Sequence, residues 1–480
     1  MLGKNLCGLG DINGDGFDDV AFSSYQPLGT YVYFGGNQAD TAPAYFLRGV
    51  GNMAAGVDMT GDGIPDIAIQ SPEDRVLLYR GLGDSIESVP SDSIQPPIAY
   101  RYGYSVRTGL VSNDAVGDLV LIDYLYPGGG RAYYYENPFT ADKEPDWSFT
   151  NQNLSHVLGN VDFIDFDGDG FQDIVLSRLA DLDSVSAVYV FKGPSFSGVP
   201  DMVIGAPVEL DTLGYPDGRS SFARRALNIG DFNGDGWEDL AVLYKATSVL
   251  YYGGPTYDTV FDLVSEVPSW AFSSAGDVNG DGWNDFLCGF TRTWFGALDL
   301  FLGGVRADSV SDYTVYESDF APYPDHSIGA VGKVVASAGD FNNDGYDDLL
   351  VANENNECCD WEFGSVYVLA GGPQIVVPVI EQEPLALPAK FVLRQNYPNP
   401  FNLATTIRFT VPIRLHVSVH IYNSLGEEVA TLLDRTIQAG DHTVTWNGRD
   451  AKGKEVSSGI YVCVLSDGMK TYSIKMLLLK

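Results

Sequence analysis

Short apolar segments recur along the first 380 residues of the chain, and Gly, Pro and Asp separate them. Val, Tyr and Phe dominate these segments, as in Asp19–Phe22, Tyr31–Phe34 and Val249–Tyr252. Residues of this kind between turn formers are typical of β-strands. Apolar positions with helical periodicity do not accompany them. The pattern therefore predicts an all-β structure for this part of the chain.

The strand-like segments are grouped around a nine-residue phrase that occurs six times. Its copies begin at Asp11, Asp58, Asp165, Asp231, Asp277 and Asp340. The steps between them are 47, 107, 66, 46 and 63 residues, so the longest step predicts a degenerate copy within it. Residues 110–118 fit, because they keep Asp114 and Asp118 but have Leu110 at position one and no Gly at position six. Seven repeats of four short strands predict a seven-bladed β-propeller.

A different pattern follows residue 380. Residues 381–389 contain two Pro and predict a semi-extended linker. Polar and apolar residues alternate at Val417–Ile421, and further strands are expected at 406–411, 444–446, 460–465 and 471–479. About seven short strands in this length predict an Ig-like β-sandwich over residues 390–480. The chain is thus expected to contain a propeller (1–380), a linker and a sandwich.

Each complete copy of the phrase places oxygen-bearing side chains at positions one, three, five and nine, and Gly at position six. Position seven is placed to offer its backbone carbonyl. Ca²⁺ takes six to eight oxygen ligands in a flexible cage, whereas the absence of His and Cys disfavours zinc and copper. The alternative is an Asx-turn hairpin without a metal. Six copies with three or four carboxylates each favour the cation, because the carboxylates would otherwise repel one another.

The six predicted Ca²⁺ sites use the same five positions, and the degenerate copy is expected to bind no metal. Their residues are Asp11, Asn13, Asp15, Phe17 and Asp19; Asp58, Thr60, Asp62, Ile64 and Asp66; Asp165, Asp167, Asp169, Phe171 and Asp173; Asp231, Asn233, Asp235, Trp237 and Asp239; Asp277, Asn279, Asp281, Trp283 and Asp285; and Asp340, Asn342, Asp344, Tyr346 and Asp348. The formal net charge of −36 argues against nucleic acid and anionic membranes as partners. Six bound divalent cations would bring this charge to −24.

The phrase, Asp-x-Asn-Gly-Asp-Gly-x-x-Asp followed by an apolar strand, resembles the calcium loop of FG-GAP (VCBS-type) repeats. Such repeats form the seven-bladed propeller of integrin α subunits and occur in many bacterial surface proteins. The resemblance covers residues 1 to about 380. It implies that the metal is structural and pins a hairpin within each blade. It does not imply an integrin partner or an integrin ligand.

The tail resembles the type A C-terminal sorting domain of the type IX secretion system of Bacteroidetes. The matching segments are Asn396–Asn402, Ile421–Gly426, Ala439–Trp446, Ser458–Tyr461 and Lys475–Met476. Leu403 stands where that family usually has Pro. The resemblance implies export across the outer membrane, often with removal of the tail and attachment to the cell surface, and it implies the secretion machinery as a partner. An Ig-like domain without a sorting role is the alternative.

No transmembrane segment is expected, because no stretch is long and apolar enough to cross a bilayer. Residues Met1–Lys4 enter the first repeat without a signal-peptide-like apolar region, so an exported protein would need a leader that this chain does not show. Five Cys without a CxxC pair predict neither a disulfide framework nor a zinc site. Cys358 and Cys359 can form a vicinal disulfide in an oxidising compartment.

No catalytic residues are expected, because the chain contains no GxSxG, HExxH or P-loop motif. His156 and His326 belong to no recognisable triad.

The expected function is binding or adhesion to an extracellular glycan or protein. A ligand rim is expected on the face opposite the metal loops, built on Trp294 and Trp361, with ordinary loop packing as the alternative. The competing function is an extracellular hydrolase or lyase, acting on a polysaccharide or peptide, on a propeller scaffold.

Overall fold

The structure is a computed structural model of the 480-residue chain. It describes residues 2–25, 28–37, 42–95, 102–112, 114–124, 129–139, 143–151, 156–180, 186–207, 222–244, 247–255, 258–265, 267, 269, 271–292, 295–316, 331–353, 365–373, 392–411, 415–423, 425–437, 440–466 and 471–479. The chain divides into two compact units, and the main boundary lies between Gln382 and Glu383. No helix in the described ranges is long and apolar enough to cross a membrane.

The first unit contains seven antiparallel sheets, here called blades one to seven, and the strands of each blade follow one another in sequence. Blades one and two contain β1 (Leu2–Gly10), β2 (Asp19–Tyr25), β3 (Leu28–Tyr33), β4 (Tyr45–Leu47), and β5 (Met53–Val57), β6 (Asp66–Ser71), β7 (Arg75–Tyr79), β8 (Asp92–Ile94). Blades three and four contain β9 (Tyr102–Gly109), β10 (Asp118–Tyr124), β11 (Gly130–Tyr135), β12 (Trp147–Thr150), and β13 (His156–Ile164), β14 (Asp173–Ala180), β15 (Ala187–Phe191), β16 (Met202–Gly205).

The remaining three blades repeat this arrangement. Blades five and six contain β17 (Ala226–Gly230), β18 (Asp239–Tyr244), β19 (Thr247–Tyr251), β20 (Leu263–Val264), and β21 (Ala271–Gly276), β22 (Asp285–Arg292), β23 (Phe295–Phe301), β24 (Tyr313–Tyr316). Blade seven contains β25 (Val331–Gly339), β26 (Asp348–Asn353) and β27 (Ser365–Leu369). Its predicted fourth strand, at 374–377, lies outside the described residues.

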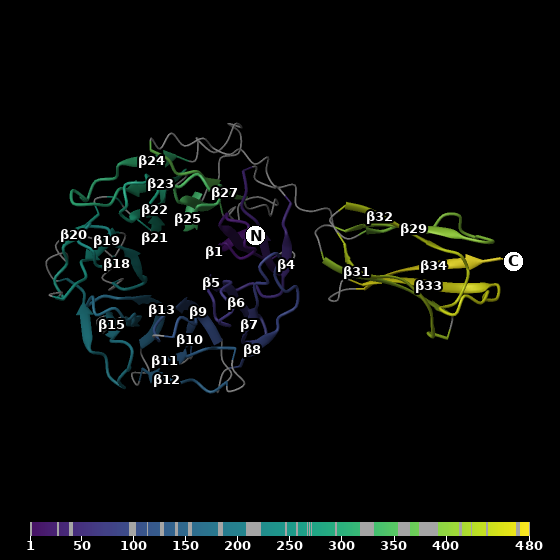
Figure 1. Cartoon of the computed structure of the whole chain (residues 1–480), viewed down its shortest axis with the longest axis horizontal. Helices are drawn as coiled ribbons and strands as arrows, with labels where there is room; N and C mark the ends of the chain where they lie inside the picture. Colours follow the sequence, from purple (N-terminus) through teal and green to yellow (C-terminus); the bar gives the residue numbers. More distant parts are fainter. Residues whose placement is uncertain are drawn as a thin grey trace. The chain divides into compact units, whose positions relative to one another are not determined.

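The blades are arranged in a ring with their first strands towards the middle (Figure 1). Each first strand contacts the first strand of the next blade, and β25 contacts β1, which closes the ring. Figure 1 places outer strands such as β8, β12 and β24 at the periphery. The predicted all-β, seven-bladed propeller is therefore confirmed.

The core of the first unit lies between neighbouring blades. Blades four and five, for example, bury Ile164, Val188, Leu240 and Val242 against one another. Because a middle strand is covered on both faces, it reads as an apolar run rather than as an alternating pattern. All six residues of β18 are buried, which shows this effect. The apolar segments of the sequence thus mark the middle strands of the blades.

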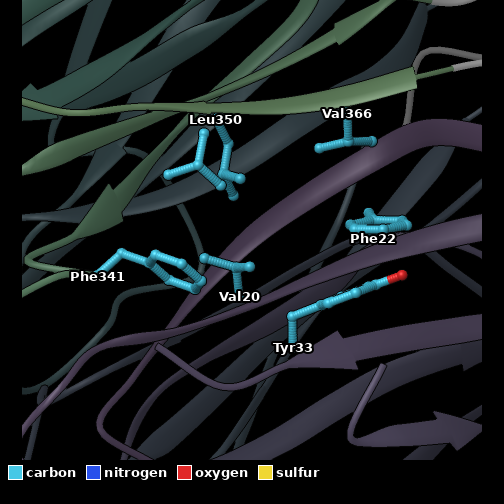
Figure 2. Close-up of a pocket in the computed structure, with 7 residues that line it drawn as sticks. Val20, Phe22, Tyr33, Phe341, Leu350 and Val366 are labelled. Atoms are coloured by element: carbon cyan, nitrogen blue, oxygen red, sulfur yellow. The ribbon is translucent and has the colours of Figure 1, made fainter. Parts of the chain in front are cut away.

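The seam between blades one and seven closes without an exchanged strand in the described part of the chain. A small apolar cavity lies at this seam (Figure 2). Its lining from blade one is Val20, Phe22 and Tyr33, and its lining from blade seven is Phe341, Leu350, Val366 and Val368. The rings of Phe22 and Tyr33 are stacked with their centroids 5.1 Å apart. Blades one and seven thus both line the cavity, and β1 contacts β25, β26 and β27 across the seam.

The second unit is a two-sheet β-sandwich, as predicted. One sheet contains β28 (Val392–Leu393), β29 (Thr405–Val411) and β32 (Gly440–Trp446); the other contains β31 (Glu428–Ile437), β30 (Leu415–Asn423), β33 (Gly459–Ser466) and β34 (Thr471–Leu478). Trp446 lies in the core of the sandwich, is 1% exposed, and packs against Phe401 and Tyr461. Ile407 and Val419 complete this core from the two sheets.

The Asn396–Asn402 segment fastens the start of the sandwich to its last strand. The Asn396 amide is buried and donates to Thr405 Oγ1 at 2.8 Å. The Asn399 side chain accepts the Leu477 N–H at 2.8 Å, and the Phe401 N–H donates to the Leu477 carbonyl at 3.0 Å. These bonds give Asn396, Asn399 and Phe401 a structural role.

Candidate metal centres

The six complete loops occupy equivalent places in their blades. In each, position one directly follows the first strand and position nine is the first residue of the second strand. We number the loops by their blades, so the complete loops are one, two, four, five, six and seven, and residues 110–118 form loop three. The structure therefore brings all the predicted ligand positions of one loop to the turn between two paired strands.

The position-one carboxylate accepts hydrogen bonds from backbone N–H groups of its own loop. In loop one, Asp11 Oδ1 accepts the Asp15 N–H at 3.0 Å and Asp11 Oδ2 accepts the Gly16 N–H at 2.9 Å. The Asn13 side-chain oxygen also accepts the Asp15 N–H, at 2.9 Å. The position-one carboxylates of loops four, five, six and seven make the same pair of bonds.

Position six requires Gly because the chain has a left-handed conformation there. The six glycines at this position have φ values between +86° and +93°. Residues with a Cβ atom adopt this region only with strain. The expectation of a sharp turn at Gly16 and its equivalents is thus confirmed.

The position-nine carboxylate is buried at the base of each loop. Asp19 is fully buried, and its two oxygens accept the N–H groups of Ile12, at 3.0 Å, and Gly35, at 2.8 Å. Burial disfavours the charged form and raises the pKa of Asp19 to about 7, with the carboxylates of Asp15 and Asp11 adding to the effect. Each carboxylate oxygen has two lone pairs, so one on each remains for a cation.

The same burial raises the pKa to about 7 in the other complete loops. This applies to Asp66, Asp173, Asp239, Asp285 and Asp348. Three oxygens of these loops are buried and have no hydrogen-bond partner: Asp173 Oδ2, Asp348 Oδ2 and Asn342 Oδ1. A buried oxygen without a partner is unfavourable, and a cation ligand position would satisfy it.

Loop four has the highest density of carboxylates. Asp165, Asp167 and Asp169 each offer an oxygen within 4.8 Å of the other two, and no other described group of acidic, His or Cys side chains reaches this density. The other complete loops have Asn or Thr at position three. Lys192 Nζ lies 2.7 Å from Asp167 Oδ2 and balances part of the additional charge. The donors of every complete loop are oxygens only, which fits a hard cation such as Ca²⁺.

Side-chain hydrogen bonds close the degenerate loop three. Ser112 Oγ donates to Asp114 Oδ1 at 2.7 Å, and Asn137 Nδ2 donates to Asp114 Oδ2 at 3.2 Å. Leu110 at position one supplies no ligand and is 48% exposed. Asp118 Oδ1 is buried without a partner here too, so an unpaired oxygen does not by itself identify a metal loop. The missing position-one carboxylate distinguishes this loop from the other six.

The side chain at position eight contacts the neighbouring blade, which the sequence did not predict. Asp18 Oδ2 accepts the N–H of Asp340, the first ligand of loop seven, at 2.9 Å. In turn, the Asp18 N–H donates to the Asp340 carbonyl at 3.1 Å. A Cβ atom on Gly339 would overlap the Asp18 carboxylate, so the Gly before position one leaves room for this contact.

The side chain at position seven also reaches the preceding loop. Trp237 lies against Gly168, and Trp283 lies against Gly234, so closely that a Cβ atom on either glycine would overlap the indole. The backbone carbonyl predicted as a metal ligand is thus carried by a residue that packs between loops. Polar residues at position eight and large ones at position seven recur in the repeat, but their partners lie one blade away and no local pattern reveals them.

The predicted ligand rim lies outside the described residues. Trp294 falls between β22 and β23, and Trp361 falls between β26 and β27, so both belong to second-to-third-strand connections as expected. His326, Cys358 and Cys359 also lie outside the described residues, and of His156 only the backbone, at the start of β13, is described. The described cysteines Cys7, Cys288 and Cys463 are free thiols.

Two parts of the chain match family models. Residues 334–369, which include loop seven, match the FG-GAP repeat, and residues 404–468 match the FlgD Ig-like domain. Integrin alpha-6 of Homo sapiens is 33% identical over 88 residues, which are 17% of this chain and 8% of that protein. The T-cell immunomodulatory protein of Mus musculus is 25% identical over 261 residues, which are 50% of this chain and 41% of that protein. The chain thus spans less than half the length of these relatives.

Similar solved structures have low sequence identity. PorZ, a bacterial surface component of the type-IX secretion system of Porphyromonas gingivalis, matches with 13% identity and a TM-score of 0.27, covering 98% of this chain and 74% of PorZ. The lectin of Aleuria aurantia, a six-bladed β-propeller, matches with 10% identity and a TM-score of 0.35, covering 62% of this chain and 91% of the lectin. The family matches and relatives describe an FG-GAP, integrin-alpha-like propeller region followed by an Ig-like domain.

Proposed function

We propose that this chain is a secreted or cell-surface binding protein with a propeller held together by about six structural Ca²⁺ ions. The propeller binds an extracellular glycan or protein, and the tail directs export through the type IX secretion machinery. The observation that carries the proposal is the repetition of one oxygen-only loop at the same place in six blades. Six equivalent sites serve the scaffold, so the function specific to this protein lies elsewhere on the propeller.

Calcium is the cation that best suits these loops. Each loop offers side-chain oxygens at four positions and a backbone carbonyl at position seven, with no nitrogen or sulfur donor. Burial, with the neighbouring carboxylates adding to it, raises the pKa of the position-nine residue, and a bound divalent cation offsets both effects. Extracellular Ca²⁺-binding modules work at about 10⁻⁴ to 10⁻³ M, so loops of this kind suit a protein that acts outside the cell.

The tail has exposed residues that its fold does not need. Tyr397 belongs to the Asn396–Asn402 segment and is 82% exposed. Leu403 directly follows the segment and is 80% exposed. Their neighbours Asn396 and Phe401 are buried and hold the sandwich together. The exposed side chains are therefore available to a secretion component that reads the tail. We propose that they form part of the export signal.

Export can be tested with a double variant of the full chain, expressed behind a signal peptide in a cell that has type IX secretion. Tyr397→Ala with Leu403→Ala is expected to fold normally, because neither side chain is buried. It is expected to accumulate in the periplasm, with at least a tenfold loss from the surface and medium. Leu425→Ala, also exposed at 81%, is the matched control and is expected to be exported normally. Normal export of both the double variant and a chain ending at residue 382 would contradict the sorting role.

Binding can be tested by screening the full chain against glycans and extracellular matrix proteins, with Ca²⁺ and with EDTA. Binding is expected in Ca²⁺ and lost in EDTA. Trp294→Ala with Trp361→Ala is expected to weaken binding at least tenfold, whereas Tyr316→Ala, exposed on an outer strand, is the control and is expected to have no effect. If the chain binds nothing but cleaves a polysaccharide or peptide, the hydrolase or lyase alternative replaces the binding role.

A further inference from the structure

The six proposed Ca²⁺ sites are not connected to their neighbours in the same way. Between loops six and seven, Asp347 Oδ2 accepts the Asp277 N–H at 2.7 Å and the Asp347 N–H donates to the Asp277 carbonyl at 3.1 Å. Between loops five and six, Asn284 and Asp231 form the same reciprocal pair, with both bonds at 3.2 Å. In each case the residue at position eight holds the backbone of the first ligand of the preceding loop.

Three more junctions use position eight in this way, and one of them joins loop four to the degenerate loop three, where Gln172 Oε1 accepts the Leu110 N–H at 2.8 Å. Asp18 and Asp340 form the reciprocal pair described above, which joins loop seven to loop one across the ring seam. Between loops four and five, Glu238 Oε2 accepts the Asp165 N–H at 2.7 Å. Loops four, five, six, seven and one are therefore joined in one unbroken series.

A backbone bond also occurs at each of the four junctions that join two complete loops of this series. A Gly that follows the third strand of one blade donates its N–H to the position-two carbonyl of the preceding loop. The bonds are Gly254 to Phe166 at 2.9 Å, Gly304 to Phe232 at 2.7 Å, Gly372 to Val278 at 2.8 Å and Gly36 to Phe341 at 2.9 Å. Among the described residues no equivalent bond links loop two to either neighbour.

Loop two lacks the position-eight side-chain connection on both sides. Its own position eight is Pro65, which has neither an N–H donor nor a side-chain acceptor for Asp11 in loop one. On its other side, position eight of loop three is Gly117, which has no side chain and contacts Asp58 only through a backbone N–H, at 2.6 Å. Loop two is thus the one complete loop that stands outside the series.

We propose that loops four, five, six, seven and one bind Ca²⁺ as one cooperative set, and that loop two binds independently. Position eight lies between two ligands of its own loop, the carbonyl at seven and the carboxylate at nine. A cation in that loop orders position eight, which then holds the first ligand of the preceding loop in place. Such coupling is reciprocal, so each occupied loop favours occupation of its neighbours. The inference rests on the proposed calcium function and makes the position-eight residues positioning residues rather than ligands.

The test is a calorimetric titration of the Ca²⁺-free full chain with CaCl₂. The expected isotherm has one cooperative phase of five sites with a Hill coefficient above about 2, and one independent site. Asn284→Ala removes a side-chain acceptor in the middle of the series without removing a ligand. It is expected to keep six sites but lower the Hill coefficient, whereas Asn284→Asp keeps an acceptor oxygen and is expected to retain it.

A gain-of-function variant makes the test independent of lost stability. Pro65→Asn supplies the missing acceptor opposite Asp11 and is expected to bring the sixth site into the cooperative phase. Six identical, independent sites in the wild-type chain would overturn this inference and leave the proposed calcium function intact. An unchanged Hill coefficient in Asn284→Ala would overturn the role of position eight. Failure of the wild-type chain to bind Ca²⁺ at all would overturn both proposals.

Discussion

Removal of Ca²⁺ with EDTA is expected to lower the melting temperature of the propeller by about 20 °C. A ligand that binds only the folded state stabilises it by about 2.7 kcal/mol per site at a hundredfold excess over its Kd, or about 16 kcal/mol for six sites. Unfolding a domain of about 380 residues, the length of the propeller, has an entropy on the order of 0.8 kcal/mol per kelvin. The ratio of these two values gives the expected shift, which differential scanning calorimetry measures.

The β-sandwich is the internal control for this experiment. It contains none of the nine-residue loops, so its transition is expected at the same temperature with and without EDTA. Adding excess Ca²⁺ is expected to restore the propeller transition, whereas Mg²⁺ is expected to restore it poorly, because Mg²⁺ dehydrates reluctantly. A propeller that melts at the same temperature in EDTA and in Ca²⁺ would refute the calcium proposal and favour hydrogen-bonded Asx turns without a metal.

Asp239→Ala is expected to destabilise the propeller by about 3 to 5 kcal/mol even in EDTA. Asp239 is fully buried and accepts N–H groups from Phe232 at 3.0 Å, Asn233 at 3.1 Å and Gly253 at 3.0 Å. The Phe232 N–H also donates to the Gly230 carbonyl at 3.0 Å, so the Asn233 and Gly253 N–H groups are the two donors left without a partner, at about 1 to 3 kcal/mol each. The residue therefore holds the base of loop five in addition to any contact with a cation. Denaturant unfolding in the two conditions measures this.

Asp235→Ala separates the metal from the hydrogen bonds in the same loop. Asp235 is exposed at position five and accepts the Trp237 N–H at 3.0 Å. The Asp235→Ala variant is expected to be less stable than the wild-type chain in Ca²⁺. In EDTA its free energy of unfolding is expected to match that of the wild-type chain within about 0.5 kcal/mol. Asp114→Ala in loop three is the matched control, with no calcium-dependent effect expected. Equal destabilisation by Asp235→Ala in both conditions would mean that the loop acts through its hydrogen bonds alone.

Much of the fold is predictable because its signals are local. The loop residues and the Gly at position six stand at fixed spacings, so the sequence places every complete loop between the correct strands. The predicted start of the strand after loop seven, Asp348, is also its start in the structure. In the tail, the sequence pattern does not predict β31. Its pairing with β30 shifts register twice, opposite Val419–His420 and opposite Ile421–Tyr422 of β30. Each shift interrupts the alternation of the β31 side chains between the two faces of the sheet.

The contacts between loops are not predictable from one chain because they join residues of different blades. Asp is a common residue in turns, so Asp18 looks like an ordinary turn residue in the sequence. Only the closed ring shows that Asp18 faces Asp340. Trp237 likewise resembles a surface aromatic until Gly168 is found beneath it. These pairs depend on the rotation from one blade to the next, which no spacing within a repeat encodes. The same holds for the division of the candidate sites into a linked series and a separate loop.

The consecutive order of the strands within each blade has a consequence for how the propeller forms. Every blade pairs neighbouring strands of one continuous segment, so its contacts close short loops and carry a small entropic cost. The seam is different, because Asp18 and Asp340 are 322 positions apart. Blades can therefore form in succession as the chain becomes available, and the contact between the first and last blades forms last. The seam is accordingly the expected place where a partly folded propeller opens.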